Sequence, residues 1–242
     1  MKYKIDFRKN VRYERMHGIH ARAALDESRF VFLPIGCLER HGDHLPMGLD
    51  VMKAHLACCV IAQCFGGAVL PPHYYAGVHF LPPEFLEATN RYGNLYADKT
   101  AENHLEELIR NLEAIGVKNL VLYSGHYPVS QNVMVRNIAA RFRSRDGIRV
   151  VPFYEKAVLY PGDHAGVCET SLLLYLDRQA VDMTAIGERN YREHSWTEEN
   201  TPEKASVAKG EAYMEKILAF FESNILTGNH PELPEDHPIF HR

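Results

Sequence analysis

The chain has 242 residues, of which 46% are hydrophobic and 24% are charged, and these proportions exclude a disordered protein. Its 27 basic and 31 acidic residues give a formal charge of -4, which disfavours a nucleic-acid partner. No apolar run approaches the ~18 residues of a membrane helix, and the first 28 residues lack the apolar region of a secretory signal. We therefore expect a cytoplasmic protein with no membrane partner.

Short apolar segments alternate along the chain with longer, helix-like segments. Strands are expected over residues 29–36, 68–72, 118–125 and 148–155. Helices are expected over 51–64, 98–115, 130–144, 167–177 and 203–225. Asp50 is the expected N-cap of the first helix, residues 71–97 form a long loop, and the tail 227–242 is extended. This alternation predicts one α/β domain over 1–242, a three-layer α/β/α sandwich around a mostly parallel sheet.

The five cysteines do not form a recognisable framework. They occupy positions 37, 58, 59, 64 and 168, with no C-x-x-C pair. This arrangement argues against disulfides and against a zinc ribbon, and it fits a reducing compartment. Cys37 and Cys168 lie close to acidic motifs, where we interpret them as small buried residues, with a catalytic thiol as the alternative.

Acidic and histidine side chains follow three of the predicted strands. The segment GCLERHGDHLPMGLD, residues 36–50, follows the first strand, and SGHYPVSQN, which contains His126, follows the third. The fourth is followed by GDHAGVCETS, which contains Asp163, His164 and Glu169. The carboxyl ends of parallel strands meet at one edge of a sheet, where α/β proteins collect their ligands. We therefore expect these side chains to lie together.

The residue types in these clusters are typical of a site for divalent metal ions. Glu39 and His41 are two residues apart, so in an extended chain their side chains point to the same side. Asp50 comes at the start of the next helix and could bridge two cations through its two oxygens, and His126 could close one coordination sphere. Mixed nitrogen and oxygen ligands suit Zn²⁺, Mn²⁺ or Fe²⁺. Two such ions would activate a shared water and polarise a carbonyl. The alternative interpretation is that any one of these clusters, taken alone, is a polar surface loop.

The three motifs together resemble those of the creatininase (creatinine amidohydrolase) family. LPIGCLERHGDHLPMGLD resembles the family's opening pattern, Pro-x-Gly-x-x-Glu-x-His-Gly-x-His-Leu-Pro followed by Asp. GHYPVSQN resembles its Gly-His motif, and DHAGVCETS its His-Ala-Gly-x-x-Glu-Thr-Ser motif. The order and spacing also agree, over roughly residues 29–180.

The resemblance implies a dinuclear metal enzyme that hydrolyses C–N bonds of cyclic or non-peptide amides. The implied metal ligands are Glu39, His41, bridging Asp50, His126 and, at the metal site of many members, Glu169. The implied catalytic residues are His164 as a proton carrier, Glu169, and Tyr127 as a candidate donor to the substrate. Two divalent ions, zinc or manganese or both, are the expected cofactors, with iron as a further candidate. Family members are often hexameric rings, so we expect a homo-oligomer that takes a small-molecule substrate.

The chain also departs from creatininase itself. There the Gly-His motif continues with Tyr and a metal-binding Glu, whereas Pro128 stands here after Tyr127, so the second ion needs Glu169 or water instead. Creatininase encloses its substrate with tryptophans, but the single Trp196 lies beyond the motifs, and Tyr160 stands where one of them would be. The segment 80–94 replaces a Phe-Pro-Gly-Thr segment common in the family. Creatinine is therefore not the expected substrate.

The expected reaction is attack on an amide-like carbonyl by a hydroxide held between the two ions. His164 or Glu169 would then protonate the leaving nitrogen, with Asp163 as a candidate to orient the His164 ring and His44 as a structural residue. The same centre could instead remove an N-formyl group or open a ring ketone of the inosose type. A catalytically silent metal-binding scaffold is the alternative that Pro128 favours.

Overall fold

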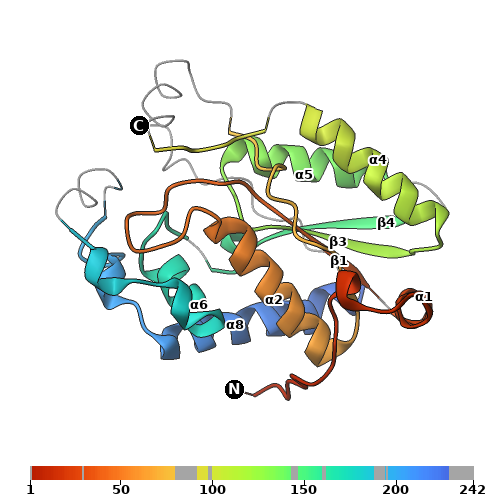
Figure 1. Cartoon of the computed structure of the whole chain (residues 1–242), viewed down its shortest axis with the longest axis horizontal. Helices are drawn as coiled ribbons and strands as arrows, with labels where there is room; N and C mark the ends of the chain where they lie inside the picture. The colour runs from red at the N-terminus through yellow and green to blue at the C-terminus, as the bar shows by residue number, and fades with distance from the viewer. Residues whose placement is uncertain are drawn as a thin grey trace.

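The computed structural model of the chain describes residues 2–28, 30–79, 92–97, 100–142, 147–159, 162–187, 194 and 196–228. Four parallel strands form one sheet in the order β2-β1-β3-β4 (Figure 1). They are β1 (Val31–Ile35), β2 (Ala68–Val69), β3 (Asn119–Ser124) and β4 (Arg149–Tyr154). The parallel α/β sheet predicted from the sequence is therefore confirmed.

Helices fill most of the remaining described chain. The α-helices are α1 (Gly18–Glu27), α2 (Leu49–Phe65), α4 (Thr100–Ala114), α5 (Val129–Arg141), α6 (Val167–Leu176) and α8 (Val207–Phe220). A π-turn, Phe221–Ile225, extends α8. Short 3-10 turns lie at Tyr13–Arg15, Glu155–Ala157, Arg178–Ala180, Met183–Ala185 and Pro202–Lys204. No helix in these described ranges has the length and apolar character needed to cross a membrane.

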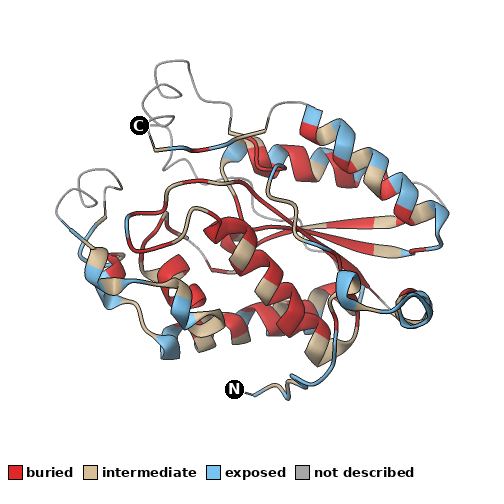
Figure 2. Cartoon of the chain, in the orientation of Figure 1, coloured by how far each residue is buried: buried red, intermediate tan, exposed pale blue. Residues whose placement is uncertain are grey.

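The helices cover both faces of the sheet, which makes three layers. On one face α4 and α5 pack with the inward side chains of alternate strand residues, such as Leu33 and Leu122. Helices α2 and α8 lie on the other face (Figure 1). They pack there with the intervening residues, such as Phe32 and Tyr123. Successive side chains of a strand point to opposite faces, so both faces contribute to the core. All five residues of β1 are consequently buried, and the exposed surface lies on the outer sides of the helices (Figure 2).

One local prediction about a helix is wrong, and one helix was not predicted. Gly48, not Asp50, is the N-cap of α2, and the Asp50 side chain bonds to other side chains instead of to the first turn of its own helix. Helix α1 was not predicted, because Leu25 is the residue that it buries and its sequence therefore lacks an apolar stripe. Tyr160, residues 80–91 and the tail from 229 lie outside the described residues.

Gly125 fixes the distance between the end of β3 and the start of α2. A Cβ atom at this position would lie 1.9 Å from the carbonyl oxygen of Asp50, so no larger residue fits without a backbone shift. This close approach brings the carboxyl end of β3, which continues to His126, against the helix turn that carries Asp50.

Candidate metal centre

The predicted ligands converge at the carboxyl edge of the sheet. Glu39 and His41 lie in the loop after β1, and His126 follows β3. Asp50 and Glu169 lie in the first turns of α2 and α6. All five side chains are buried, although carboxylates are rarely buried without a partner. The structure thus brings together every residue that the sequence proposed as a metal ligand.

One group of possible ligands surrounds His126. Its Nδ1 atom lies 3.0 Å from Oδ2 of Asp50 and 3.2 Å from Oε2 of Glu39. The thiol of Cys37 donates to the same Asp50 oxygen at 3.5 Å. The other ring nitrogen of His126, Nε2, is buried and has no hydrogen-bond partner among the residues that the structure describes. An imidazole nitrogen between two carboxylate oxygens is an arrangement in which a cation would share all three atoms.

A second group surrounds His41. Its Nε2 atom lies 3.2 Å from Oδ1 of Asp50 and 3.7 Å from Oε2 of Glu169. Its Nδ1 atom lies 2.9 Å from the carbonyl oxygen of Glu39. A carbonyl can only accept, so Nδ1 carries a proton, and Nε2 is the nitrogen that faces the carboxylates and would bind an ion after losing its own proton. The neutral ring would then be the tautomer that a metal-binding histidine requires.

Asp50 belongs to both groups, through different oxygens. Within each group the potential ligand atoms lie within 4.8 Å of one another, and a third group of this kind joins Glu39, His41 and His164. Burial opposes the charge on Asp50, but His41 and His126 outweigh it and hold the pKa of this carboxyl well below its usual range. The shared carboxylate and the two imidazoles fit a site for two divalent ions.

Glu169 belongs to the second group of ligands, whereas Pro128 contributes no ligand. Pro128 lies directly before α5 and offers no ligand atom. Glu169 instead faces His41 with Oε2, which also accepts from the backbone N–H of Ala165 at 2.8 Å. Its Oε1 atom lies 2.7 Å from both the Tyr127 hydroxyl and the Lys53 ammonium. Tyr127, the candidate donor to the substrate, therefore contacts Glu169. Lys53, which also contacts Glu169, was not identified from the sequence as a residue of the site.

His164 lies next to the second group but is oriented by the backbone. Its ring centroid is 4.4 Å from that of His41, and its Nε2 atom lies 3.2 Å from the carbonyl oxygen of Arg40. Trp196, expected to lie beyond the motifs, donates through Nε1 to the His164 carbonyl at 2.9 Å. Burial, followed by the neighbouring His41, lowers the pKa of His164. The ring is therefore a neutral imidazole near neutral pH.

Asp163 does not orient His164 as the sequence suggested. Its carboxylate accepts from the backbone N–H groups of Cys168 at 2.6 Å and Glu169 at 3.1 Å, which caps the first turn of α6. Burial and then the charge of Glu169 raise the pKa of Asp163 to about 7. This cap fixes the helix turn that carries Glu169.

Other residues of the centre were not found from the sequence. Tyr96 donates to Oε1 of Glu39 at 2.7 Å, and the His79 ring lies 5.8 Å from that of His126. His194 stacks on Trp196 at 5.1 Å and accepts from the backbone N–H of Gly42 through Nε2 at 3.0 Å. These residues come from the loop after β2 and the segment before α8, where no local pattern marks them. His44, expected to be structural, is buried with Nε2 2.9 Å from Oγ1 of Thr170.

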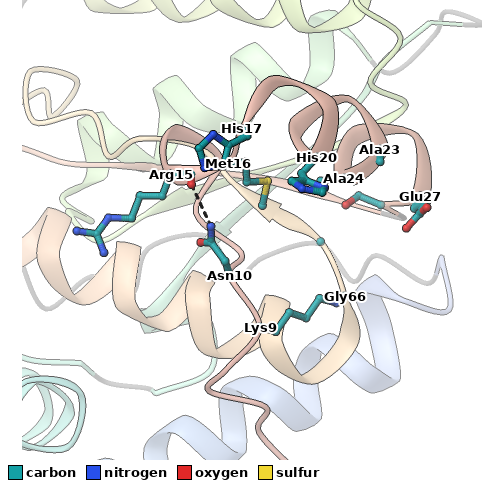
Figure 3. Close-up of a pocket in the computed structure, with 12 residues that line it drawn as sticks. Lys9, Asn10, Arg15, Met16, His17, His20, Ala23, Ala24, Glu27 and Gly66 are labelled. Carbon is teal, nitrogen blue, oxygen red and sulfur yellow. Dashed lines mark hydrogen bonds between the residues drawn. The ribbon is translucent and has the colours of Figure 1, made fainter.

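A hollow of about 560 Å³ lies at the opposite end of the sheet (Figure 3). Its walls come from the segment before α1, one side of α1 and the turn at Gly66, just before β2, and include Lys9, Arg15 and His20. These segments precede the strands, whereas the metal-type residues follow them. Among the described residues the three ligand groups all lie at the carboxyl edge, so the chemistry belongs there and not in this hollow.

Fold and site together define an α/β protein with a candidate two-ion centre. The sequence profile of the creatininase family, described as creatinine amidohydrolase, matches residues 14–224. A creatinine amidohydrolase from Pseudomonas putida is 30% identical over 185 residues, which is 64% of this chain and 67% of that protein. The chain therefore belongs to the creatininase family of amidohydrolases.

Solved structures agree with this fold. A crystal structure of creatinine amidohydrolase (creatininase) has a TM-score of 0.72 and 23% identity, and covers 92% of this chain and 99% of that one. A manganese form of creatininase has a TM-score of 0.70 at 22% identity, covering 92% and 100% of the two chains. A zinc–zinc form of a creatininase variant has a TM-score of 0.67 at 21% identity with the same coverage.

Proposed function

We propose that this protein is a metal-dependent hydrolase that cleaves a C–N bond of a cyclic or non-peptide amide. The observation that carries the proposal is the shared carboxylate of Asp50, whose two oxygens face two separate sets of nitrogen and oxygen ligands. Related structures are manganese and zinc forms, and the same ligand chemistry suits both ions here. We therefore propose two divalent ions, zinc or manganese or both, as the cofactors.

Each of the two proposed ions would have its own set of ligands, with Asp50 common to both. One ion would be held by Glu39, Asp50 and His126, and the other by His41, Asp50 and Glu169. Such a pair of ions supplies an activated water and polarises the carbonyl under attack. Tyr96 and Tyr127 direct hydroxyl groups at the carboxylates of Glu39 and Glu169, which limits how far these carboxylates can rotate.

His164 is the proposed proton carrier. The Arg40 carbonyl accepts the proton on Nε2, so Nδ1 is the nitrogen that can take up and release a further proton. Because the pKa of His164 is lowered, the ring is unprotonated before reaction and can receive a proton from the attacking water. It can then pass that proton to the leaving nitrogen.

The test is a hydrolysis screen with protein loaded with Zn²⁺ or Mn²⁺. Cyclic amides, creatinine included, would be compared with N-formyl compounds and polyhydroxylated ring ketones. We expect the protein to release an amine or to open the ring of a cyclic amide. This activity should be lost in the Glu39→Gln and His164→Asn variants. Formate release would assign a deformylase, and ketone ring opening an inosose-type hydrolase. No turnover of any class by fully loaded protein would favour a silent metal-binding scaffold and reject the proposal.

We also propose that the enzyme acts as a homo-oligomer in the cytoplasm. Family resemblance supports a hexamer, and the five free cysteines support a reducing compartment. Light scattering after size-exclusion chromatography tests the assembly directly. A monomer at micromolar concentration would contradict it.

A further inference from the structure

A lysine is buried beside the second group of ligands. The Lys53 side chain has 0% of its surface exposed, although α2 places it one turn after Asp50. Its ammonium lies 2.7 Å from Oε1 of Glu169 and 2.8 Å from Oε2 of Glu155. It also lies 4.5 Å from the ring centroid of Tyr127. A buried charge is costly unless it is paired, so this lysine remains an ammonium because two carboxylates neutralise it.

Glu155 anchors the lysine from the side opposite to Glu169. It follows the last residue of β4 and is itself buried. Its second oxygen, Oε1, accepts from the Tyr123 hydroxyl at 3.1 Å. The Lys53 ammonium is therefore fixed between two carboxylates, of which only Glu169 also belongs to a metal group.

The partners of Glu169 restrict how it can bind an ion. Oε1 faces the ammonium of Lys53 and the hydroxyl of Tyr127, and Oε2 accepts from the N–H of Ala165. A carboxylate has about four lone-pair positions, so one position on Oε2 remains, on the side of His41. Glu169 can thus give an ion a single oxygen, and part of its charge is already neutralised by Lys53.

We propose that Lys53 is a built-in cation that weakens metal binding at the His41–Asp50–Glu169 group relative to the Glu39–Asp50–His126 group. The two metal positions of this chain are then unequal, with the second held more weakly. Like charges repel strongly in a buried site, and the ammonium lies against the carboxylate that the second ion must use. Glu39 instead receives a hydrogen bond from the neutral Tyr96 hydroxyl. The inference rests on the metal centre of the proposed function and not on any choice of substrate.

The test is a metal titration of chelator-treated protein, followed by calorimetry and equilibrium dialysis with Zn²⁺ and Mn²⁺. The variants are Lys53→Met, Glu155→Gln and the double variant, each checked for folding by circular dichroism. Lys53→Met removes the cation, and Glu169 retains Tyr127 and Ala165, so the second ion should bind about tenfold or more tightly. Glu155→Gln removes the compensating anion, so the second ion should bind more weakly than in the unmodified protein. The affinity for the first ion should change less in both variants.

The opposite signs separate this role from a merely structural one. If Lys53 and Glu155 acted only through packing, every variant would bind the second ion more weakly. The double variant replaces the ion pair by neutral groups, which buried sites often tolerate, and it isolates Lys53 in a background where Glu155 is already neutral. In this folded double variant, unchanged or weaker binding of the second ion than in Glu155→Gln would overturn the proposal, even if the single Lys53→Met variant did not fold. Because the readout is ion affinity, failure to find a substrate would leave this result unaffected.

Discussion

Oδ1 of Asp50 lies 3.2 Å from Nε2 of His41. The second oxygen of the same carboxylate faces His126 instead, so one buried side chain connects two sets of ligands that come from different strand ends. This connection is what distinguishes a centre for two ions from two separate polar clusters. It depends on the first turn of α2, which Gly125 allows to approach the end of β3.

Replacing Asp50 by Asn should remove both ions, because the amide keeps the shape but loses the charge that both groups share. We expect the metal content to fall close to zero and turnover to fall to background. Elemental analysis after gel filtration measures the metal, with circular dichroism as the control for folding. Glu39→Gln is the matched variant that changes a ligand of only one of the two proposed ions, and it should also lose turnover. Full metal retention in Asp50→Asn would contradict the bridging role.

Replacing His164 by Asn should slow catalysis without removing the ions. The backbone carbonyl of Arg40 orients the ring. Proton transfer by a positioned side chain of this kind contributes about 10²–10⁴-fold to the rate. We expect kcat to fall by that factor at unchanged metal content. If the variant instead lost an ion, His164 would be a ligand in the group that it forms with Glu39 and His41.

Replacing Tyr127 by Phe should weaken metal retention. Its hydroxyl lies 2.7 Å from Oε1 of Glu169 and 2.9 Å from the Asp163 carbonyl, so it orients a ligand. Loss of such a partner typically costs about 10–100-fold in metal affinity or activity. A competition titration with a chromogenic chelator measures the affinity. A variant with unchanged affinity and a raised KM would show that the hydroxyl contacts the substrate instead.

Much of this centre could be predicted because its ligands follow strands and its motifs are local. Glu39, His41 and His126 come directly after buried apolar segments, and parallel strands bring their carboxyl ends together. Glu155 also follows a strand and Lys53 lies in a helix, but neither belongs to one of the three motifs, so the sequence did not single them out. Lys53 lies on the same helix as Asp50, but only the folded structure, in which α2 lies beside α6 and the residue after β4, shows that its ammonium is buried between two carboxylates.

Neither the Asp50 contacts nor the position of Trp196 could be predicted, because both depend on contacts between segments that are far apart in the sequence. Asp50 was expected to cap α2 because aspartate before a helix usually does so. Here the helix begins at Leu49, two residues earlier than expected, and the Asp50 carboxylate faces His41 and His126 instead of backbone N–H groups. Trp196 lies beyond the motifs in the sequence, and nothing in the local sequence shows that its segment returns to the His164 carbonyl.

The stability of the metal-free protein should depend on His44 between pH 6.5 and 4. Burial lowers the pKa of His44 to about 4, whereas the unfolded chain takes up this proton near pH 6.5. Stability is therefore lost as the pH falls through this range, because the unfolded state binds the proton first. His44→Gln keeps a hydrogen-bonding group but cannot titrate, and its loss of stability over this range should be smaller by about 1–2 kcal/mol. Urea unfolding at pH 7 and pH 4.5 measures the difference, and equal losses in both proteins would contradict the assignment.

The metal content of the protein tests the central claim most directly. The protein would be purified without chelators or a metal-affinity tag, and zinc, manganese and iron would be measured per chain by elemental analysis before and after reconstitution. We expect two divalent ions per chain after reconstitution. The ion at the His41–Asp50–Glu169 group should be the first to be lost on dialysis. No bound ion after reconstitution with Zn²⁺ or Mn²⁺ would contradict the central claim.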